Sequence, residues 1–503
     1  MGRLLSRSFA KWRKTHFRAT HDDSARLVPA GTPVANRGSI RLIIALMLTE
    51  FIKFVLVGSV FFGAAPVAGF LMKDRRSWQR AAFALMCFMT LNGLLAEGNW
   101  GKTLASIEWY RGHTKGFHFY FNHALAIALL VAAWRENPQR FLRPPPGLLA
   151  YWIYCAVSMV SIVTAPNPWY VLMAAQKMFF ASVLFLAVFH FLRNHDDVAF
   201  FLKVMAFTLL WEAFVVLKMK YFDGMYQVRG TFEHQNPLSM YAVMIGMVFL
   251  AVGLGPQMRG DRWCQLAFVA CAIIVQSTLS RGGMVVFALG SIVVVALCVV
   301  EKVTRRRLLV ISVMALVGAI GLLLTADTIS ARFNDHGNQA SGELRDVLNE
   351  ASRQMVRDHP LGVGWNNFGL TINHPYPYAN VVYDWLEERN MPVDYEAPNA
   401  LVESHYYLLL AENGYPGWAA YLTLISCFLW KNLRAAIAYG SSPLRWVSVG
   451  IGTGCALNYL QSMLERVLTQ PRNLMLWLIL LGLTSRLDAW RRESAENSKS
   501  RTQ

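Results

Sequence analysis

Hydrophobic positions in this chain form long uninterrupted blocks that short polar connections separate. Residues 237–256, 283–300 and 307–326 are such blocks, with almost no charge. About 18 to 20 apolar residues in a helix are enough to cross the roughly 30 Å hydrocarbon layer of a membrane. Twelve blocks of this kind predict twelve membrane-spanning helices. They cover residues 80–96, 118–134, 148–165, 168–192, 198–220, 237–256, 264–280, 283–300, 307–326, 404–430, 444–467 and 472–489.

The apolar segment 42–72 is harder to interpret. It is too long for one ordinary membrane span and short for two. We favour a hairpin that enters and leaves on one face, because the basic residues on both sides of it then share a compartment. The sequence thus predicts an all-α polytopic membrane protein with about 12 to 14 transmembrane helices.

Lys and Arg indicate the orientation, since cytoplasmic connections are enriched in them. They gather on alternate connections, near residues 73–76, 135–143, 259–262, 302–307 and 431–434. The basic first 41 residues and the Arg491–Arg492 tail favour the same side. The predicted organisation has a basic cytoplasmic arm, two membrane regions, a periplasmic loop between them and a cytoplasmic tail. The arm covers residues 1–41 and the tail residues 490–503. The membrane regions cover 42–326 and 404–489, and the loop between them covers 327–403.

Composition supports this organisation, because 55% of the residues are hydrophobic and only 16% are charged. The formal net charge of +17 is mostly explained by the Lys and Arg of the predicted cytoplasmic connections. The sequence has no nucleic-acid-binding motif. We therefore expect no nucleic-acid partner. The N-terminal arm is instead expected to contact anionic membrane lipids.

The loop 327–403 reverses the charge of the chain, with twelve Asp or Glu against five Arg and no Lys. It is too long to be a simple connector. Leu344, Val347, Leu348, Ala351 and Met355 recur at helical spacing and predict an amphipathic helix. This helix is either a lid over the membrane helices or an ordinary surface helix.

Three polar clusters fall on the extracytoplasmic side of the predicted topology, at residues 228–237, 277–283 and 397–406. In the first, Asn236 is a plausible N-cap and Pro237 suits the first helical position. The candidate functional residues of the three clusters are Arg229, Glu233, His234, Arg281, Glu403 and His405.

Together these side chains favour one kind of chemistry. Arg binds phosphate oxygens bidentately and keeps its charge, and His accepts a proton near neutral pH. Guanidinium groups beside a histidine therefore suit a reaction with a pyrophosphate leaving group and a hydroxyl nucleophile. No Asp-x-Asp pair or His-rich cluster lies near the motifs, so we expect neither a metal nor another cofactor. His359, His374 and Asp358 are better explained by a tight turn around Pro360 than by an ion site.

Five short motifs resemble the O-antigen ligase family of polysaccharide ligases and polymerases. They are Arg229-Gly230-Thr231-Phe232 with Asn236-Pro237, Leu279-Ser280-Arg281-Gly282-Gly283, Gly342-Glu343-Leu344-Arg345, His359-Pro360-Leu361-Gly362-Val363-Gly364, and His405 with Leu408, Glu412, Gly414 and Gly417. The resemblance is strongest from about residue 225 to 425. It implies a helical fold of the GT-C type in a bacterial inner membrane, with the active site on the periplasmic side.

The resemblance also implies an activity: metal-independent, inverting transfer of a glycan from undecaprenyl pyrophosphate to an acceptor hydroxyl. The acceptor would be another glycan, a lipid A core sugar or a protein hydroxyl. Carried over by position, Arg229 and Arg281 would bind the pyrophosphate, with Arg345 as a further candidate. His405 would be the base that activates the acceptor.

Two other functions remain open. A transporter or flippase of lipid-linked glycans also fits many spans, and Glu50, Lys53 and Glu212 lie in or near apolar blocks. A scaffold for polysaccharide assembly would leave the Arg and His side chains replaceable. Within the enzyme interpretation, the motifs do not distinguish a ligase from a polymerase.

Overall fold

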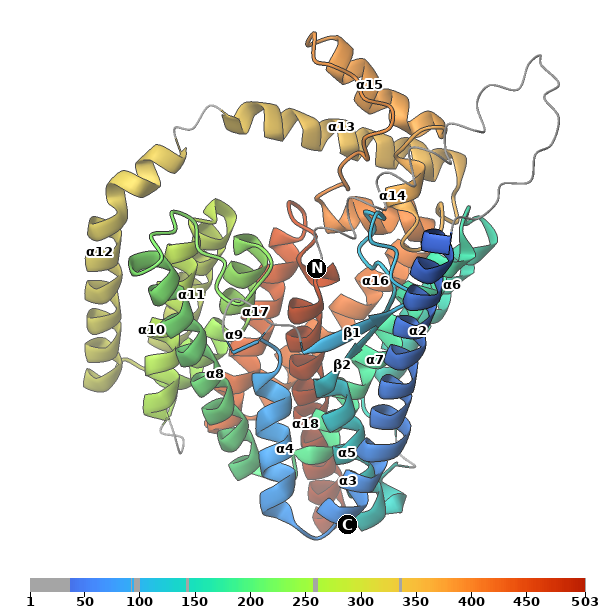
Figure 1. The fold of residues 1–503 in the computed structure, drawn as a ribbon. Coiled ribbons are helices and arrows are strands. Elements are labelled where there is room, and N and C mark those ends of the chain that lie inside the picture. Colours follow the sequence, from blue (N-terminus) through green and yellow to red (C-terminus); the bar gives the residue numbers. More distant parts are fainter. Residues whose placement is uncertain are drawn as a thin grey trace, which may run out of the picture. The chain divides into compact units, whose positions relative to one another are not determined.

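The computed structural model describes residues 37–91, 93–94, 100–141, 144–256, 261–333 and 337–502. The chain divides into two units, residues 1–52 and 53–503. Most of the N-terminal arm predicted for residues 1–41 lies outside the described residues. Helices dominate the second unit (Figure 1), in agreement with the predicted helical fold.

The described helices follow the predicted hydrophobic blocks closely. In chain order the α-helices are α2 (Arg37–Gly58), α3 (Ala65–Met72), α4 (Arg76–Phe88), α5 (Phe121–Glu136), α6 (Leu148–Met159), α7 (Pro168–Phe191), α8 (His195–Tyr221), α9 (Gln235–Leu254), α10 (Asp261–Thr278), α11 (Arg281–Glu301), α12 (Arg305–Phe333), α13 (Gly337–Asp358), α14 (Phe368–Thr371), α15 (Asn380–Glu387), α16 (His405–Ala438), α17 (Pro443–Gln461) and α18 (Pro471–Thr502). Short π or 3₁₀ segments are η2 (Ser59–Ala64), η3 (Pro138–Phe141), η4 (Val160–Val163), η5 (Pro377–Ala379) and η6 (Val467–Thr469).

In the described part of the chain, five helices are long and apolar enough to cross a membrane. They are Met47–Met72, Pro168–Phe191, His195–Tyr221, Gln235–Leu254 and Arg281–Glu301. Shorter apolar helices cover Leu148–Val163, Arg262–Thr278 and Arg307–Leu316. Length and composition therefore support a membrane protein, and the number of twelve to fourteen spans stays a prediction.

Segment 42–72 is one continuous helical run, so the predicted hairpin is wrong. α2 leads into the π-helical η2, which leads into α3 without a turn. A reversal would need polar turn residues, whereas residues 58–66 are almost all small or apolar. Pro66 lies in the first turn of α3, directly after the π-helical segment, where a missing amide hydrogen is tolerated.

The second correction concerns the expectation of an all-α fold. β1 (Gly101–Leu104) and β2 (Phe117–Tyr120) form an antiparallel pair, with Lys102 opposite Phe119. The aromatic side chains of β2 favour a strand over the helix predicted from residue 118. The pair closes the segment 105–116, which is anchored beside α7 because the Gln176 side chain accepts from and donates to the His118 backbone.

α9 is the most enclosed helix of the second unit. All its residues from Pro237 to Leu254 are buried, and it packs against α10, α11 and α17. An apolar helix that is covered on every side lies within a helical core, whereas a helix facing lipid keeps one side exposed. α9 therefore forms a fixed support for the two loops that precede α9 and α11.

The predicted amphipathic helix is confirmed as α13, whose buried face includes Leu348, Ala351 and Met355. These residues pack in one apolar cluster with Phe368 of α14 and Leu408 of α16. Figure 1 shows α13, α14 and α15 together at one end of the helices. The acidic loop is thus folded onto the start of α16.

α16 is broken at Gly414, which has φ 63° and ψ −170°. The break frees backbone groups that the segment around Gly362 satisfies. Val363 and Gly364 donate their N–H groups to the carbonyls of Ala411 (2.8 Å) and Glu412 (3.0 Å). A Cβ at Gly414 would lie 2.1 Å from the Pro360 carbonyl oxygen, so only glycine fits this contact. The Gly362 N–H also bonds to the His359 carbonyl (2.7 Å), which confirms the tight turn predicted there.

Candidate active site

The loop that carries Arg229 is held by a buried carboxylate. Glu212 of α8 is fully buried, and its two oxygens accept from the Thr231 N–H (2.8 Å) and the Thr231 hydroxyl (2.9 Å). Gly230 lies between Arg229 and Thr231 with φ 55°. Glu212 thereby fixes the turn that presents the exposed Arg229 side chain.

We predict that Gly230→Ala damages this turn. A Cβ at Gly230 would lie 2.0 Å from the Glu212 carboxylate, in a backbone conformation that costs a non-glycine residue about 1 kcal/mol or more. The variant should lose most transfer activity and unfold at a lower temperature in detergent. Gly224→Ala is the matched control, because Gly224 also has positive φ but no atom lies within 4 Å of the place that its Cβ would take. Equal behaviour of the two variants would contradict the role of Glu212.

Arg281 is the first residue of α11. Ser280 caps this helix, with its hydroxyl accepting from the Gly283 N–H at 3.4 Å. The next residue, Gly282, lies so close to Gln461 that a Cβ would be 2.2 Å from its side-chain nitrogen. The half-buried Arg281 is thus placed where a helix N-terminus already favours an anion.

The structure joins the three predicted clusters through backbone contacts and one short segment. The Val228 N–H donates to the Ser277 carbonyl (3.4 Å), which links the Arg229 loop to the Arg281 turn. The segment 461–470, which connects α17 to α18, contacts all three clusters. Gln461 touches Gly282, Ser462 accepts from the His405 N–H (2.9 Å), and Glu465 accepts from the Asn236 side chain (2.7 Å). The sequence did not identify this segment as part of the site.

The first cluster differs in detail from its prediction. His234, rather than Asn236, is the N-cap of α9, and its Nδ1 accepts from the Asn236 N–H (3.4 Å). Because this ring nitrogen caps the helix, His234 has a structural role. Glu233 is exposed and lines a small pocket with Arg472.

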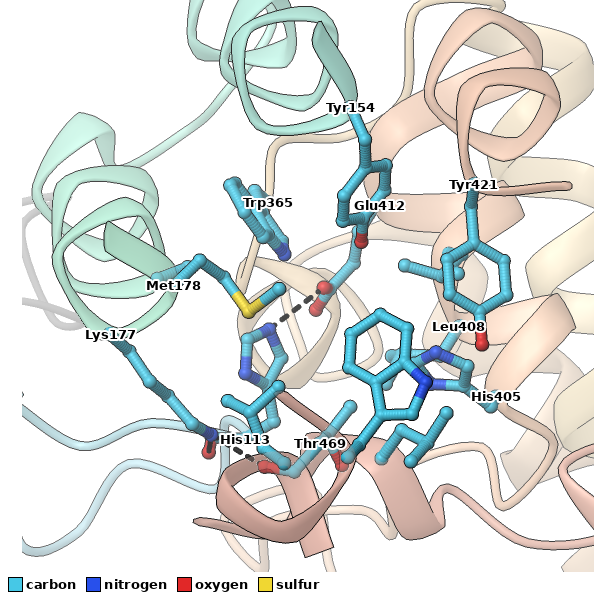
Figure 2. A pocket seen from close by; sticks show the side chains of 15 residues that line it. His113, Tyr154, Lys177, Met178, Trp365, His405, Leu408, Glu412, Tyr421 and Thr469 are labelled. Atoms are coloured by element: carbon cyan, nitrogen blue, oxygen red, sulfur yellow. Dashed lines mark hydrogen bonds and ion pairs between the residues drawn. The ribbon is translucent and has the colours of Figure 1, made fainter. Parts of the chain in front are cut away.

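His405 lies elsewhere, at the wall of a small enclosed cavity (Figure 2). Its side chain is 4% exposed, and its ring packs edge-on against Tyr421 at 5.1 Å. The cavity has a volume of about 30 Å³ and is lined by aromatic side chains. Arg229 and Arg281 do not line it. The structure therefore places the two arginines on neighbouring turns and His405 in the wall of a separate cavity. The segment 461–470 contacts the clusters that carry all three residues.

Three residues of this cavity were missed as site residues. His113 Nε2 lies 3.2 Å from Glu412 Oε2, and their side chains are 7% and 1% exposed. Lys177 of α7 donates to the backbone carbonyls of His113 (3.1 Å) and Thr469 (2.5 Å). Figure 2 shows these groups and His405 around the same space. Glu412 is seven residues after His405 on α16, a spacing of two helical turns that indicates a shared face.

Arg345 is engaged by a carboxylate. It binds Glu403 through Nε (2.9 Å) and Nη2, with side chains 29% and 43% exposed. This contact ties α13 to the chain before α16. Glu403 thus offsets the charge of Arg345.

Two charged residues of the connecting segment lie partly enclosed beside this pair. Burial raises the pKa of Glu465, and the charge of Glu403 acts in the same direction. Burial lowers the pKa of Arg466, while Glu403, Glu465 and Glu412 oppose that change. Charged residues within the predicted block 444–467 were the signal that could have identified this segment.

The arrangement suits an acid-base reaction beside an anion site. Arg229 and Arg281 supply positive charge on neighbouring turns. Two imidazoles and a carboxylate surround one enclosed cavity. The two positively charged turns and the imidazole-lined cavity are thus separate places in the structure.

Comparison with known protein families gives a match over part of the chain. Residues 266–422 match the family model described as O-antigen ligase. The matched range contains Arg281, Arg345, His405 and Glu412, and Arg229 and His113 lie before it. No curated protein matches the chain. The match confirms the resemblance to the O-antigen ligase family over residues 266–422, which contain all of the quoted motifs except the one that begins at Arg229.

Proposed function

We propose that the protein transfers a glycan from a lipid-linked pyrophosphate donor to an acceptor hydroxyl. The donor is undecaprenyl pyrophosphate-linked glycan, and the reaction inverts the sugar linkage without a metal. The observation that carries the proposal is the convergence of the Arg229 loop, the Arg281 turn and His405 on the segment 461–470. The O-antigen ligase match and the apolar helices support the same reaction in a bacterial inner membrane.

In this proposal the arginines and His405 have separate roles. Arg229 and Arg281 bind pyrophosphate oxygens, and their fixed charge stabilises the leaving group as the bond to the sugar breaks. His405 accepts the proton of the attacking hydroxyl. Arg345 and Glu403 hold α13 near the site, and no residue is assigned to a metal.

Nothing found supports the alternative of a transporter or flippase. That alternative drew on charged residues in apolar blocks, and Glu212 was the most enclosed of them. Its carboxylate is used by Thr231 to shape the Arg229 loop. These hydrogen bonds give the buried Glu212 carboxylate a structural role, so its presence in an apolar block does not require a transported ion.

A deletion strain tests the proposal. We expect the mature glycan to disappear from its acceptor while lipid-linked glycan accumulates on the periplasmic side. Long chains left on the lipid carrier would identify a ligase, and single repeat units would identify a polymerase. Unchanged glycans would contradict the proposed function, and accumulation confined to the cytoplasmic side would indicate a flippase.

A further inference from the structure

Two imidazoles face the same cavity, although the proposed reaction uses only one of them. His113 and His405 both line it, from the segment between the two strands and from the start of α16. Figure 2 shows the two rings on different walls. Within the described residues, Nδ1 of each ring is buried and has no hydrogen-bond partner. Buried ring nitrogens of this kind require an explanation.

His113 is oriented by a fixed carboxylate. Glu412 Oε1 accepts from the Phe368 N–H (3.2 Å), and Oε2 faces His113 Nε2 (3.2 Å). A carboxylate at this position favours the tautomer with its proton on Nε2. Nδ1 of His113, which is buried, then carries a lone pair that can accept a proton. Lys177 holds the His113 carbonyl, which fixes the backbone of the same residue.

The cavity that both rings line is large enough to hold a water molecule. Its volume of about 30 Å³ exceeds the roughly 10 to 15 Å³ that one water molecule needs. Aromatic residues form much of the remaining wall, namely Tyr154, Trp365, Tyr421 and Trp477. A single water or hydroxyl group in this space would have the two imidazoles among its polar neighbours, together with Lys177 and Glu412.

We propose that His113 and Glu412 receive the proton that His405 takes from the acceptor; the inference rests on the proposed transfer reaction. The acceptor O–H bond breaks as its oxygen attacks the sugar carbon, and the bond from that carbon to the pyrophosphate breaks. His405 takes the proton on one nitrogen and releases the proton of its other nitrogen through one water to His113 Nδ1. The resulting imidazolium is paired with the Glu412 carboxylate. The proton later leaves to solvent, so His113 and His405 both return to their neutral forms.

The surroundings of His113 favour only brief protonation of its imidazole. Burial lowers the pKa of His113, and the positive charges of Lys177 and Arg466 act in the same direction. Glu412 is the group that opposes them. The net effect favours the neutral imidazole, which is the form that can accept a proton. Without Glu412 the charged form would lose its main stabilising partner.

A double-mutant cycle tests the proposal on the purified full-length protein. The variants are His113→Gln, His405→Ala and the pair, with turnover measured from lipid-linked donor to acceptor. We expect His113→Gln to lower kcat by about 10- to 100-fold with the donor KM unchanged. The double variant should be no slower than His405→Ala, because residues that act in one path are not additive. Glu412→Gln, which keeps the side-chain shape, should lower kcat in the same way.

His190→Gln is the matched control. His190 is also a buried histidine with an unpartnered Nδ1 among the described residues, but its ring stacks on Phe141 away from the cavity. We expect it to keep normal kcat. Multiplicative losses in the double variant, or full kcat in His113→Gln, would overturn the path. Wild-type activity in His405→Ala would remove its first step, and absence of transfer by the wild-type protein would reject the proposed function itself.

Discussion

Replacing His405 by alanine should lower turnover by about 10²- to 10⁴-fold, the range typical of a lost general base. A sugar hydroxyl is a poor nucleophile at neutral pH, so proton removal limits its attack. The donor pyrophosphate would still be bound by Arg229 and Arg281, which lie outside the cavity of His405. Affinity for the donor should therefore survive. Binding of labelled donor and single-turnover transfer by the purified variant measure the two effects separately.

His234→Ala is the control for this experiment. His234 is the other imidazole near the first cluster, and its Nδ1 is engaged in capping α9. We expect this variant to retain most activity. Wild-type turnover in His405→Ala combined with a large loss in His234→Ala would transfer the role of base to His234. In the wild-type protein the rate should fall at acidic pH, because a protonated imidazole cannot accept the acceptor's proton.

Replacing Arg229 or Arg281 by alanine should abolish measurable transfer, and replacing either by lysine should leave at most partial activity. Guanidinium presents a planar set of donors to two phosphate oxygens, whereas an ammonium group provides only a point charge. Donor binding should weaken in both alanine variants. Saturation kinetics with lipid-linked donor measure the loss of affinity and the loss of rate.

Arg434→Ala is the matched control, since Arg434 is an exposed cation on a connection predicted to face the cytoplasm. We expect it to transfer glycan normally. All variants should insert into the membrane at normal levels, because Arg229 is exposed and Arg281 is half-buried. Full activity of either alanine variant at normal expression would exclude that arginine from the site.

Most of the helices were predictable, because a block of apolar residues is a local signal. The hairpin at 42–72 was wrong because the prediction relied on charge distribution, which does not report local backbone geometry. Arg281 and His405 were proposed as site residues from short motifs. His113 could not be found in this way, since its partner Glu412 is 299 residues away in sequence. Only the folded chain brings the segment between the two strands to the start of α16.

The break in α16 determines which site residues would move together. His405 and Glu412 both precede Gly414, whereas Lys431, which binds Asp488 of α18 at 3.2 Å, follows it. The N-terminal part of α16 is also joined to the segment around Gly362 by backbone hydrogen bonds. A rotation about Gly414 would thus carry the imidazole and the carboxylate as one rigid piece. Their mutual spacing is independent of the angle between the two halves of the helix.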